Sequence, residues 1–458
     1  MSEEKNWLPG AGLEPSDLAV KRFSLLKHVD SLLHGAERTG EAVILTSAHE
    51  PKQTWELPPR IDGLQIQGAG YPRKGKKMSE LTLGVIGTSK MEDEQRVPIH
   101  PDHFPRISEE YRKQLIFEEG YGAPFGVSDS EIALQTGGIA SRSELLAELG
   151  NVIIAKPTLA DLKDLREGGI LWGYPHCAQQ RAITQTAIDR KLTLIAFEDM
   201  FVWGPSGQIG RHTFYKNNEM AGYCAVLHAL QLKGIDGHYG NQRKTLIFSF
   251  GAVSRGAIYA LKAHGFRDIT ICIQRPDHEV REEVLDCHYV RLRQGGKGEA
   301  RMLVVEHDGS ERALSDLIGE SDIIINGTFQ EPDHPVDFVT EAEKTCLKPG
   351  SLIIDVSCDE GMGFYFAKPT TFKKPMIKIG DTDYYAVDHT PSYLWESASR
   401  SISAALIVHL PTVVEGRASW QKNETIRRAV NIDAGVIVNP TILSFQNRQP
   451  NYPHAPLA

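Results

Sequence analysis

The sequence predicts an α/β protein with two doubly wound domains. Short apolar runs typical of buried strands recur between residues 81 and 356, and most of them are separated by segments with helical spacing. Such alternation favours parallel sheets with helices on both faces. At 458 residues, the chain is also long for one hydrophobic core, which favours two domains.

Five strand-like segments predict the first domain. Each is a short apolar run of the kind that forms a buried parallel strand. The predicted strands are residues 81–86, 114–118, 152–155, 169–174 and 192–197. After a turn at Pro391, a helical pattern at 393–410 is expected to return the chain to this domain. The first domain would then be discontinuous, with the second domain inserted in it.

The second domain is predicted to begin with a strand, a tight turn and a helix. Residues 246–250 are an apolar run, and Gly251 allows the backbone to turn closely. Residues 254–264 carry apolar residues at helical spacing, and Gly265 follows as a natural C-cap. The other elements expected are a long helix at 218–233 and strands at 269–275, 303–306, 322–326 and 351–356.

A strand, glycine turn and helix in this order can hold the pyrophosphate of a dinucleotide against the helix N-terminus. The glycine pattern is incomplete, because Ser249 and Ser254 stand where the first and third glycines of G-x-G-x-x-G would fall. Gly251 matches the motif, and Gly256 lies close behind it. A degenerate glycine turn also occurs in α/β proteins that bind no nucleotide. The predicted cofactor contacts in this turn are Ser249, Gly251, Ala252, Val253 and Ser254.

The end of the second strand in this unit predicts which dinucleotide binds. NAD sites place an Asp or Glu there to bind both ribose hydroxyls, whereas this sequence has Gln274 and Arg275. A neutral amide and a guanidinium suit a 2′-phosphate. We therefore predict NADP as the cofactor, with Gln274 and Arg275 among its contacts and with NAD as the alternative.

The chain is expected to have three regions. Residues 1–77 form an N-terminal extension with one amphipathic helix near 16–34 and a short strand at 42–46. Met78 directly precedes the first strong strand, a position that would suit an initiator methionine. The expected substrate domain comprises residues 78–217 and 391–458, and the expected NADP-binding domain comprises residues 218–390. The substrate would bind in the cleft between these Rossmann-like domains.

The composition fits a cytoplasmic enzyme that acts on small molecules. The formal net charge of −9 argues against a nucleic-acid partner, and the basic run at 73–77 is too short to reverse it. The six cysteines form no C-x-x-C pair and show no metal-ligand spacing, so we expect reduced thiols and no metal site. We expect neither a membrane span nor a secretory signal, because the apolar runs are short and the N-terminus is acidic and polar.

Three basic side chains follow predicted strands of the first domain. Arg96 comes after the first strand, Lys156 ends the third, and His176 follows the fourth. The carboxyl ends of parallel strands line one crevice, so we expect these side chains to meet there, where Arg96 could bind a carboxylate. Asp359 follows a late strand of the second domain, where an acid would face the nicotinamide. Each could instead be a surface or turn residue, since single residues of these types are common there.

Six short motifs follow one another along the chain. They are Glu94-x-Arg96-Val, Ala155-Lys156-Pro, Tyr174-Pro-His176-Cys, Asn217-Asn-Glu219-Met-Ala-Gly222, Asp355-x-x-x-Asp359-x-Gly361 and Val387-Asp-His-x-Pro-Ser392. Their order and spacing resemble those of the alanine dehydrogenase and transhydrogenase superfamily. Within it, the sequence is most similar to the N(5)-(carboxyethyl)ornithine synthases and less similar to the lysine-forming saccharopine dehydrogenases. The resemblance runs from about residue 81 to near the C-terminus.

The resemblance implies a role for each candidate residue. Arg96 and Lys156 would bind a 2-oxo acid, His176 would be the acid/base, and Asp359 would lie by the nicotinamide. It also implies an NAD(P)-dependent oxidoreductase that acts on CH–NH groups and forms a homo-oligomer.

The expected reaction joins a 2-oxo acid to an amine. Pyruvate would condense with the side-chain amine of a basic amino acid such as ornithine, and NADPH would reduce the product to an N-(carboxyethyl) amino acid. Glu198, Asp199 or Glu219 could hold a second ammonium group. The alternatives are an alanine dehydrogenase that uses ammonia, a saccharopine-type enzyme that uses lysine and 2-oxoglutarate, and a regulatory protein that only senses NADP.

Overall fold

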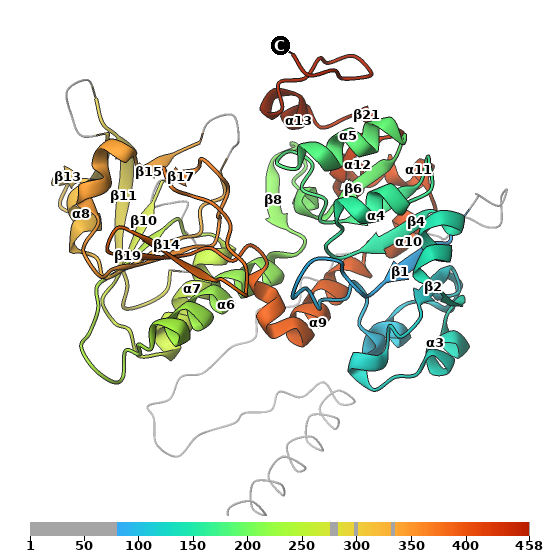
Figure 1. The fold of residues 1–458 in the computed structure, drawn as a ribbon, viewed down its shortest axis with the longest axis horizontal. Helices are drawn as coiled ribbons and strands as arrows, with labels where there is room; N and C mark the ends of the chain where they lie inside the picture. The colour runs from blue at the N-terminus through green and yellow to red at the C-terminus, as the bar shows by residue number, and fades with distance from the viewer. Residues whose placement is uncertain (1–79, 275–282, 297–300, 331–334, 458) are drawn as a thin grey trace, which may run out of the picture. The chain divides into compact units, whose positions relative to one another are not determined.

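The computed structural model describes residues 80–274, 283–296, 301–330 and 335–457. The predicted extension at 1–77 lies outside these residues, together with its expected helix and strand, and so does Arg275. The described residues contain two large sheets. In Figure 1 the first includes blue to green strands together with the red C-terminal strand β21, and the second includes yellow to orange strands.

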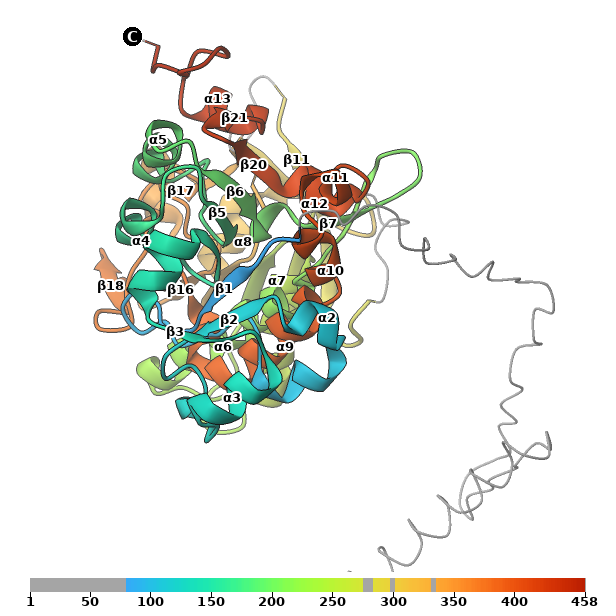
Figure 2. The same ribbon diagram turned by 90° about the vertical axis from the view of Figure 1, so that its right-hand side faces the viewer.

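The first sheet has eight strands within the described ranges, in the order β21-β20-β6-β5-β4-β1-β2-β3. Strands β1 to β6 are parallel, and β1 has β2 on one side and β4 on the other, as in a doubly wound sheet. The strands are β1 (Leu83–Ile86), β2 (Leu115–Glu118), β3 (Gly138–Ala140), β4 (Asn151–Ile154), β5 (Ile170–Gly173), β6 (Thr193–Ala196), β20 (Val430–Asp433) and β21 (Val436–Ile437). The C-terminal strand β20 pairs antiparallel with β6, and Figure 2 shows the two side by side.

The second sheet has nine strands in the described part of the chain, in the order β13-β12-β11-β10-β9-β14-β16-β19-β18. Its six central strands, from β11 to β19, are parallel, and the edge strands β12, β13 and β18 are antiparallel to their neighbours. The strands are β9 (Thr245–Phe248), β10 (Ile269–Ile273), β11 (His288–Gln294), β12 (Met302–Val305), β13 (Glu311–Ala313), β14 (Ile323–Asn326), β16 (Leu352–Asp355), β18 (Met376–Ile379) and β19 (Thr382–Tyr385). Two further strand pairs are β7 (Phe201–Trp203) with β8 (Ile209–His212), and β15 (Asp337–Val339) with β17 (Gly363–Phe364).

Helices connect the strands. The α-helices are α2 (Glu109–Arg112), α3 (Asp129–Gln135), α4 (Leu159–Asp164), α5 (Arg181–Asp189), α6 (Tyr215–Lys233), α7 (Ala252–Ala263), α8 (Leu314–Glu320), α9 (Trp395–Leu406), α10 (Leu410–Val414), α11 (Arg417–Trp420), α12 (Glu424–Ala429) and α13 (Pro440–Phe445). Short 3-10 helices are η1 (Pro101–Arg106), η2 (Ala123–Phe125), η4 (Phe197–Asp199), η6 (Glu341–Cys346) and η7 (Thr390–Leu394), and η3 (Glu144–Leu149) is a π-helix. None of the described helices is both long and apolar enough to cross a membrane.

Both sheets are buried on both faces, which confirms the predicted fold class. Along β4, Ile153 packs into one core with residues of α9 and α10, while Val152 and Ile154 pack into another with residues of α4 and α5. Along β14, Ile325 joins a core that includes α6 and α7, and Ile324 joins one that includes α8. Successive side chains of a strand point to opposite faces, so this division is what helices on both sides require.

The predicted strands of both sheets are present, whereas several other strands, including β19 and β20, were missed. Strand β19 contains Thr382 and Asp383 among its four residues, and β20 contains Asn431 and Asp433, so neither has a strong apolar pattern. Residues 303–306 were expected to continue the sheet, and β12 does so as an antiparallel strand near its edge. Phe250, predicted as the last residue of a strand, lies in the turn after β9.

Helices α6 and α7 cross at two glycines, with no room for a side chain at either. A Cβ atom on Gly222 would lie 1.8 Å from the carbonyl oxygen of Val253, and one on Gly256 would lie 1.7 Å from the carbonyl oxygen of Glu219. Gly256 was considered from the sequence only as a neighbour of the pyrophosphate motif. Its role in the structure is to let the two backbones touch.

Replacing Gly256 by alanine should therefore destabilise the fold. An added Cβ atom would collide with the backbone of α6, and overpacking of this kind lowers the free energy of unfolding by about 1–3 kcal/mol or more. This loss exceeds the gain of about 1 kcal/mol that alanine brings through its higher helix propensity. Thermal unfolding should show a lower Tm for Gly256→Ala. The matched control is Gly319→Ala in α8, where the nearest atom would be 3.1 Å away. Equal Tm values for the two variants would contradict the close crossing.

Candidate functional site

Lys156 and His176 meet at the carboxyl edge of the first sheet. Lys156 follows β4 and His176 follows β5, and these two strands are neighbours in the parallel sheet. The Nζ atom of Lys156 lies 3.0 Å from Nε2 of His176. An ammonium group only donates hydrogen bonds, so His176 accepts this one through Nε2 and is neutral when it does so.

The environment of His176 favours the neutral ring. Burial and the positive charge of Lys156 together lower the pKa of His176 to about 3. The charge of Arg96 acts in the same direction. The backbone of His176 has a φ of 49°, and its N–H donates to Oε1 of Glu198 at 2.7 Å. The neutral imidazole is the form that a general base uses, and negative charge on a bound substrate would raise its lowered pKa toward neutral pH.

Asp388 and His389 approach this pair from the segment that follows β19. Oδ2 of Asp388 lies 3.7 Å from Nζ of Lys156, and its Oδ1 lies 2.7 Å from Nδ1 of His389. Burial acts to raise the pKa of Asp388, but Lys156 and His389 hold it well below its usual range. The other ring nitrogen of His389 lies 2.9 Å from the carbonyl oxygen of Glu92. Both nitrogens of His389 thus lie within hydrogen-bond distance of an oxygen atom, which fixes the orientation of the ring.

Arg96 is buried and is held on one side by an ion pair. Its Nε and Nη2 groups donate to the two carboxylate oxygens of Glu94, and Nη1 donates to Asn217 at 3.2 Å. Ser392 also donates to Glu94. Although burial acts to raise it, contacts with Arg96 lower the pKa of Glu94 to about 2. Asn217 belongs to α6 and Ser392 to η7, so both later segments help to position Arg96.

Glu198 lies beside His176 with one carboxyl oxygen unpaired. Its Oε2 atom is buried and has no hydrogen-bond partner among the described residues. Burial and the neighbouring charge of Asp199 raise the pKa of Glu198 to about 8. Asp199 itself accepts a hydrogen bond from Asn439 at 3.2 Å. The third acid considered from the sequence, Glu219, lies on α6 and pairs with Lys216 at 2.8 Å.

Asp359 lies in the loop after β16. Burial raises the pKa of Asp359 to about 6, and the charges of Lys156 and Asp388 are close enough to act on it. The loop is anchored by Asp355, which accepts hydrogen bonds from the Cys358 backbone N–H at 3.0 Å and from the Tyr384 hydroxyl at 2.8 Å. The structural role of Asp355 was not expected from the sequence, which pointed only to its place in a motif.

The turn after β9 has the geometry of a phosphate-binding turn despite its serines. Ser249 has a φ of 72°, the left-handed conformation that the first glycine of such a motif supplies. Its hydroxyl lies 2.9 Å from Oγ of Ser254 and donates to the carbonyl oxygen of Gly327. A Cβ atom on Gly251 would meet no atom within 4 Å, so the space in front of α7 can hold a phosphate. The residues present therefore fit a dinucleotide, whose pyrophosphate would face the N–H groups of Ala252, Val253 and Ser254.

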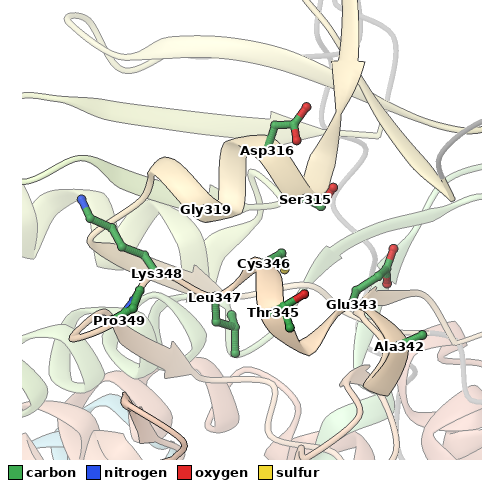
Figure 3. Close-up of a pocket in the computed structure, with 10 residues that line it drawn as sticks. All are labelled: Ser315, Asp316, Gly319, Ala342, Glu343, Thr345, Cys346, Leu347, Lys348 and Pro349. Atoms are coloured by element: carbon green, nitrogen blue, oxygen red, sulfur yellow. The ribbon is translucent and has the colours of Figure 1, made fainter.

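Two other regions bear on the predicted cofactor and substrate sites. Gln274 directly follows β10 and is exposed, whereas Arg275 lies outside the described residues. A surface pocket lies between α8 and η6 and is lined by residues such as Ser315, Cys346 and Lys348 (Figure 3). It contains none of the predicted site residues. No group of residues suited to hold a metal ion occurs in the described part of the chain.

Known proteins resemble the chain over most of its length. The family model "Alanine dehydrogenase/PNT, N-terminal domain" matches residues 86–203, and "Alanine dehydrogenase/PNT, C-terminal domain" matches residues 273–440. An N(5)-(carboxyethyl)ornithine synthase of Clostridium botulinum is 26% identical over 69% of this chain and 90% of its own length. An alanine dehydrogenase of Mycobacterium tuberculosis is 22% identical over 78% of this chain and 95% of its own length.

Two solved structures have the same fold. An L-alanine dehydrogenase aligns with a TM-score of 0.61 and 16% identity, covering 79% of this chain and 98% of its own. A transhydrogenase from Sinorhizobium meliloti aligns with a TM-score of 0.56 and 16% identity, covering 78% of this chain and 99% of its own. At 16% sequence identity, these two structures show that the fold is shared and show nothing more.

The raised pKa of Glu198 predicts how the thermal stability of the protein depends on pH. A raised folded-state pKa contributes stability below the unfolded value of 4.5, and this contribution is lost as the pH rises through about 8. Glu198→Gln keeps an acceptor for the His176 N–H but cannot ionise. Its Tm should therefore rise by a few degrees relative to the unmodified protein between pH 5 and pH 9. The exposed Glu119→Gln serves as the control, and a constant Tm difference for Glu198→Gln would refute the burial of this carboxyl.

Proposed function

The chain belongs to the alanine dehydrogenase/PNT family, and we propose that it condenses a 2-oxo acid with an amino-acid side-chain amine and reduces the product with NADPH. The family makes it an NAD(P)-dependent oxidoreductase of the amino-acid dehydrogenase type. The proposed substrates are pyruvate and a basic amino acid such as ornithine. The observation that carries this choice is the unpaired, buried carboxyl oxygen of Glu198 beside His176.

Arg96 is proposed to bind the carboxylate of the 2-oxo acid. A guanidinium has five N–H groups, and those not used by Glu94 and Asn217 include one on each terminal nitrogen. Two such groups can bind a carboxylate through both of its oxygens. Glu94 and Asn217 keep the guanidinium in one orientation, which favours a single pose of the substrate.

Lys156 and His176 are proposed to move the protons of condensation. With the carboxylate on Arg96, the keto oxygen would lie near the ammonium group of Lys156, which polarises the carbonyl. The amine attacks the keto carbon, and neutral His176 takes the proton that the amine loses. The keto oxygen then leaves as water once Lys156 and His176 have returned protons to it, and a C=N bond remains.

The reduction needs a hydride at the carbon of this C=N bond. A nicotinamide cofactor, with its pyrophosphate at the turn after β9, supplies that hydride when it is bound. Asp359 is proposed to lie by the nicotinamide ring, because its loop belongs to the second sheet and its charge interacts with Lys156. Fixing both reactants beside these groups removes much of the entropic barrier.

Glu198 and Asp199 favour an amino acid over ammonia as the amine. A cationic co-substrate would give the unpaired oxygen of Glu198 a partner and would favour its ionised form, which burial otherwise opposes. Asp199 would add a second negative charge next to it. Ammonia brings no second cation and would leave these acids uncompensated. The synthase-like relatives support the same choice, while the alanine dehydrogenase relatives keep ammonia as the second candidate.

A panel of amines with pyruvate and NADPH should identify the co-substrate. Ornithine or lysine should support NADPH oxidation, and mass spectrometry should find the N-(carboxyethyl) adduct. Ammonium should support it poorly. The same panel with 2-oxoglutarate examines the saccharopine-type alternative. Efficient alanine formation from ammonium, with no adduct from any amino acid, would show that the chain is an alanine dehydrogenase.

Removing Lys156 or His176 should abolish turnover without releasing the cofactor. We expect His176→Ala to lower kcat by about a hundredfold or more through loss of the proton transfer, and Lys156→Ala to lower it at least as much. The affinity for NADPH, measured by fluorescence, should stay nearly constant. The exposed Lys163→Ala is the control for loss of a lysine. Near-normal turnover in either site variant would exclude that residue from the reaction.

A further inference from the structure

His212 ends the hairpin that begins shortly after Glu198. This hairpin consists of β7 and β8, and His212 is the last residue of β8. Two contacts close its base. Nε2 of His212 lies 3.1 Å from the carbonyl oxygen of Glu198, and the Thr213 N–H donates to the carbonyl oxygen of Met200 at 2.7 Å. His212 therefore contacts the backbone of the acid that lies beside His176.

The partners of His212 determine which of its ring nitrogens carries the proton. The Phe214 N–H donates to Nδ1 at 3.1 Å, so Nδ1 is an acceptor and has no proton. The carbonyl oxygen of Glu198 can only accept, so Nε2 carries the proton and donates it. Burial lowers the pKa of His212 to about 4, which keeps the ring neutral near neutral pH. His212 is therefore a fixed donor to Glu198.

Glu198 is held at both ends. Its Oε1 atom accepts a hydrogen bond from the His176 N–H at 2.7 Å, and its backbone carbonyl accepts one from His212. Its Oε2 atom is the group left without a partner among the described residues. The position of this free oxygen therefore depends on the hydrogen bonds that hold the rest of the residue.

His212 also contacts the start of α6. Its Nδ1 atom lies 3.3 Å from Nδ2 of Asn218, and the neighbouring Asn217 accepts a hydrogen bond from Nη1 of Arg96 at 3.2 Å. One imidazole ring thus lies between the segment that carries Glu198 and the helix that positions Arg96. The spacing of the acid and the arginine depends in part on this ring.

We propose that His212 is a positioning residue for the amine substrate, because it holds Glu198 where the free carboxyl oxygen can bind the second ammonium group of that substrate. The inference rests on the proposed function, in which Glu198 pairs with a cationic amino acid. His212 acts through Glu198. Loss of its hydrogen bond to Glu198 should therefore weaken binding of the amine and spare both the 2-oxo acid and the dinucleotide.

Two amide substitutions separate the two hydrogen bonds of His212. His212→Asn keeps an acceptor near Nδ1 for the Phe214 N–H, as in an Asx turn, but is too short to reach Glu198. His212→Gln places an amide donor near Nε2 and keeps the bond to Glu198. With the full-length protein, pyruvate and NADPH, His212→Asn should raise the KM for ornithine by about threefold to tenfold, as expected for one lost hydrogen bond.

The other kinetic constants identify the step that His212 affects. In His212→Asn, kcat at saturating ornithine and the KM for pyruvate should change by less than about twofold, because the lost bond costs little once the amine is bound. In His212→Gln, the KM for ornithine should also stay within about twofold of the unmodified value. Calorimetry with ornithine and the NADPH-bound protein checks the same affinity without turnover, and lysine replaces ornithine if it is the better substrate.

Controls separate the possible failures. His307→Asn changes an exposed histidine in the turn after β12 and should alter nothing. If His212→Asn unfolds in circular dichroism, His212→Leu replaces it as a variant without the donor. An unmodified protein that binds neither ornithine nor lysine, or an affinity that Glu198→Gln leaves unchanged, would overturn the proposed amine site and the role of His212 with it. If Glu198→Gln weakens ornithine binding but His212→Gln binds ornithine no better than the variant without the donor, the proposed function stands and the role of His212 is overturned.

Discussion

The close contact between α6 and α7 determines where the dinucleotide turn after β9 lies relative to Arg96. Gly222 of α6 lies against the backbone of Val253, which belongs to the first turn of α7, where the pyrophosphate would bind. At its start, the same helix carries Asn217, which binds Arg96. The carbonyl of Ala221 accepts a hydrogen bond from Thr390, two residues after Asp388. One helix therefore relates the turn after β9, Arg96 and the Asp388–His389 segment.

The charges at the site form an alternating series. His389 faces Asp388, Asp388 faces Lys156, and Lys156 faces the neutral ring of His176. Removing the charge of any member would change the proton affinity of the next, because buried charges interact strongly. Burial and the positive charge of Lys156 both lower the pKa of His176, while the same lysine lowers the pKa of Asp388. The series also places a proton donor and a proton acceptor within one hydrogen bond of each other, which is what reversible addition to a carbonyl requires.

Much of the fold and part of the candidate site could be predicted from the sequence, because the periodicity of apolar residues locates the strands and therefore the residues at their ends. Lys156 and His176 were both found because parallel strands bring their carboxyl ends to one edge. The roles of Asp388 and His389 could not be found in this way, because they depend on contacts between segments more than two hundred residues apart. Strands such as β19 were missed because their polar residues leave no strong apolar pattern. Gly256 was noted only as a neighbour of the dinucleotide motif, and the crossing with α6 shows what its missing side chain permits.

The left-handed serine at the start of the phosphate turn bears on how such turns are recognised. A side chain in that conformation costs about 1–2 kcal/mol, which glycine avoids. Here the Ser249 hydroxyl ties the turn to Gly327 after β14 and to Ser254 in α7, and these bonds offset the strain. The turn keeps its shape through hydrogen bonds of the Ser249 side chain rather than through the conformational freedom of a glycine. A dinucleotide motif is therefore better defined by the torsion angle it demands than by the letter G, and chains that satisfy the angle with serine escape a search for glycines.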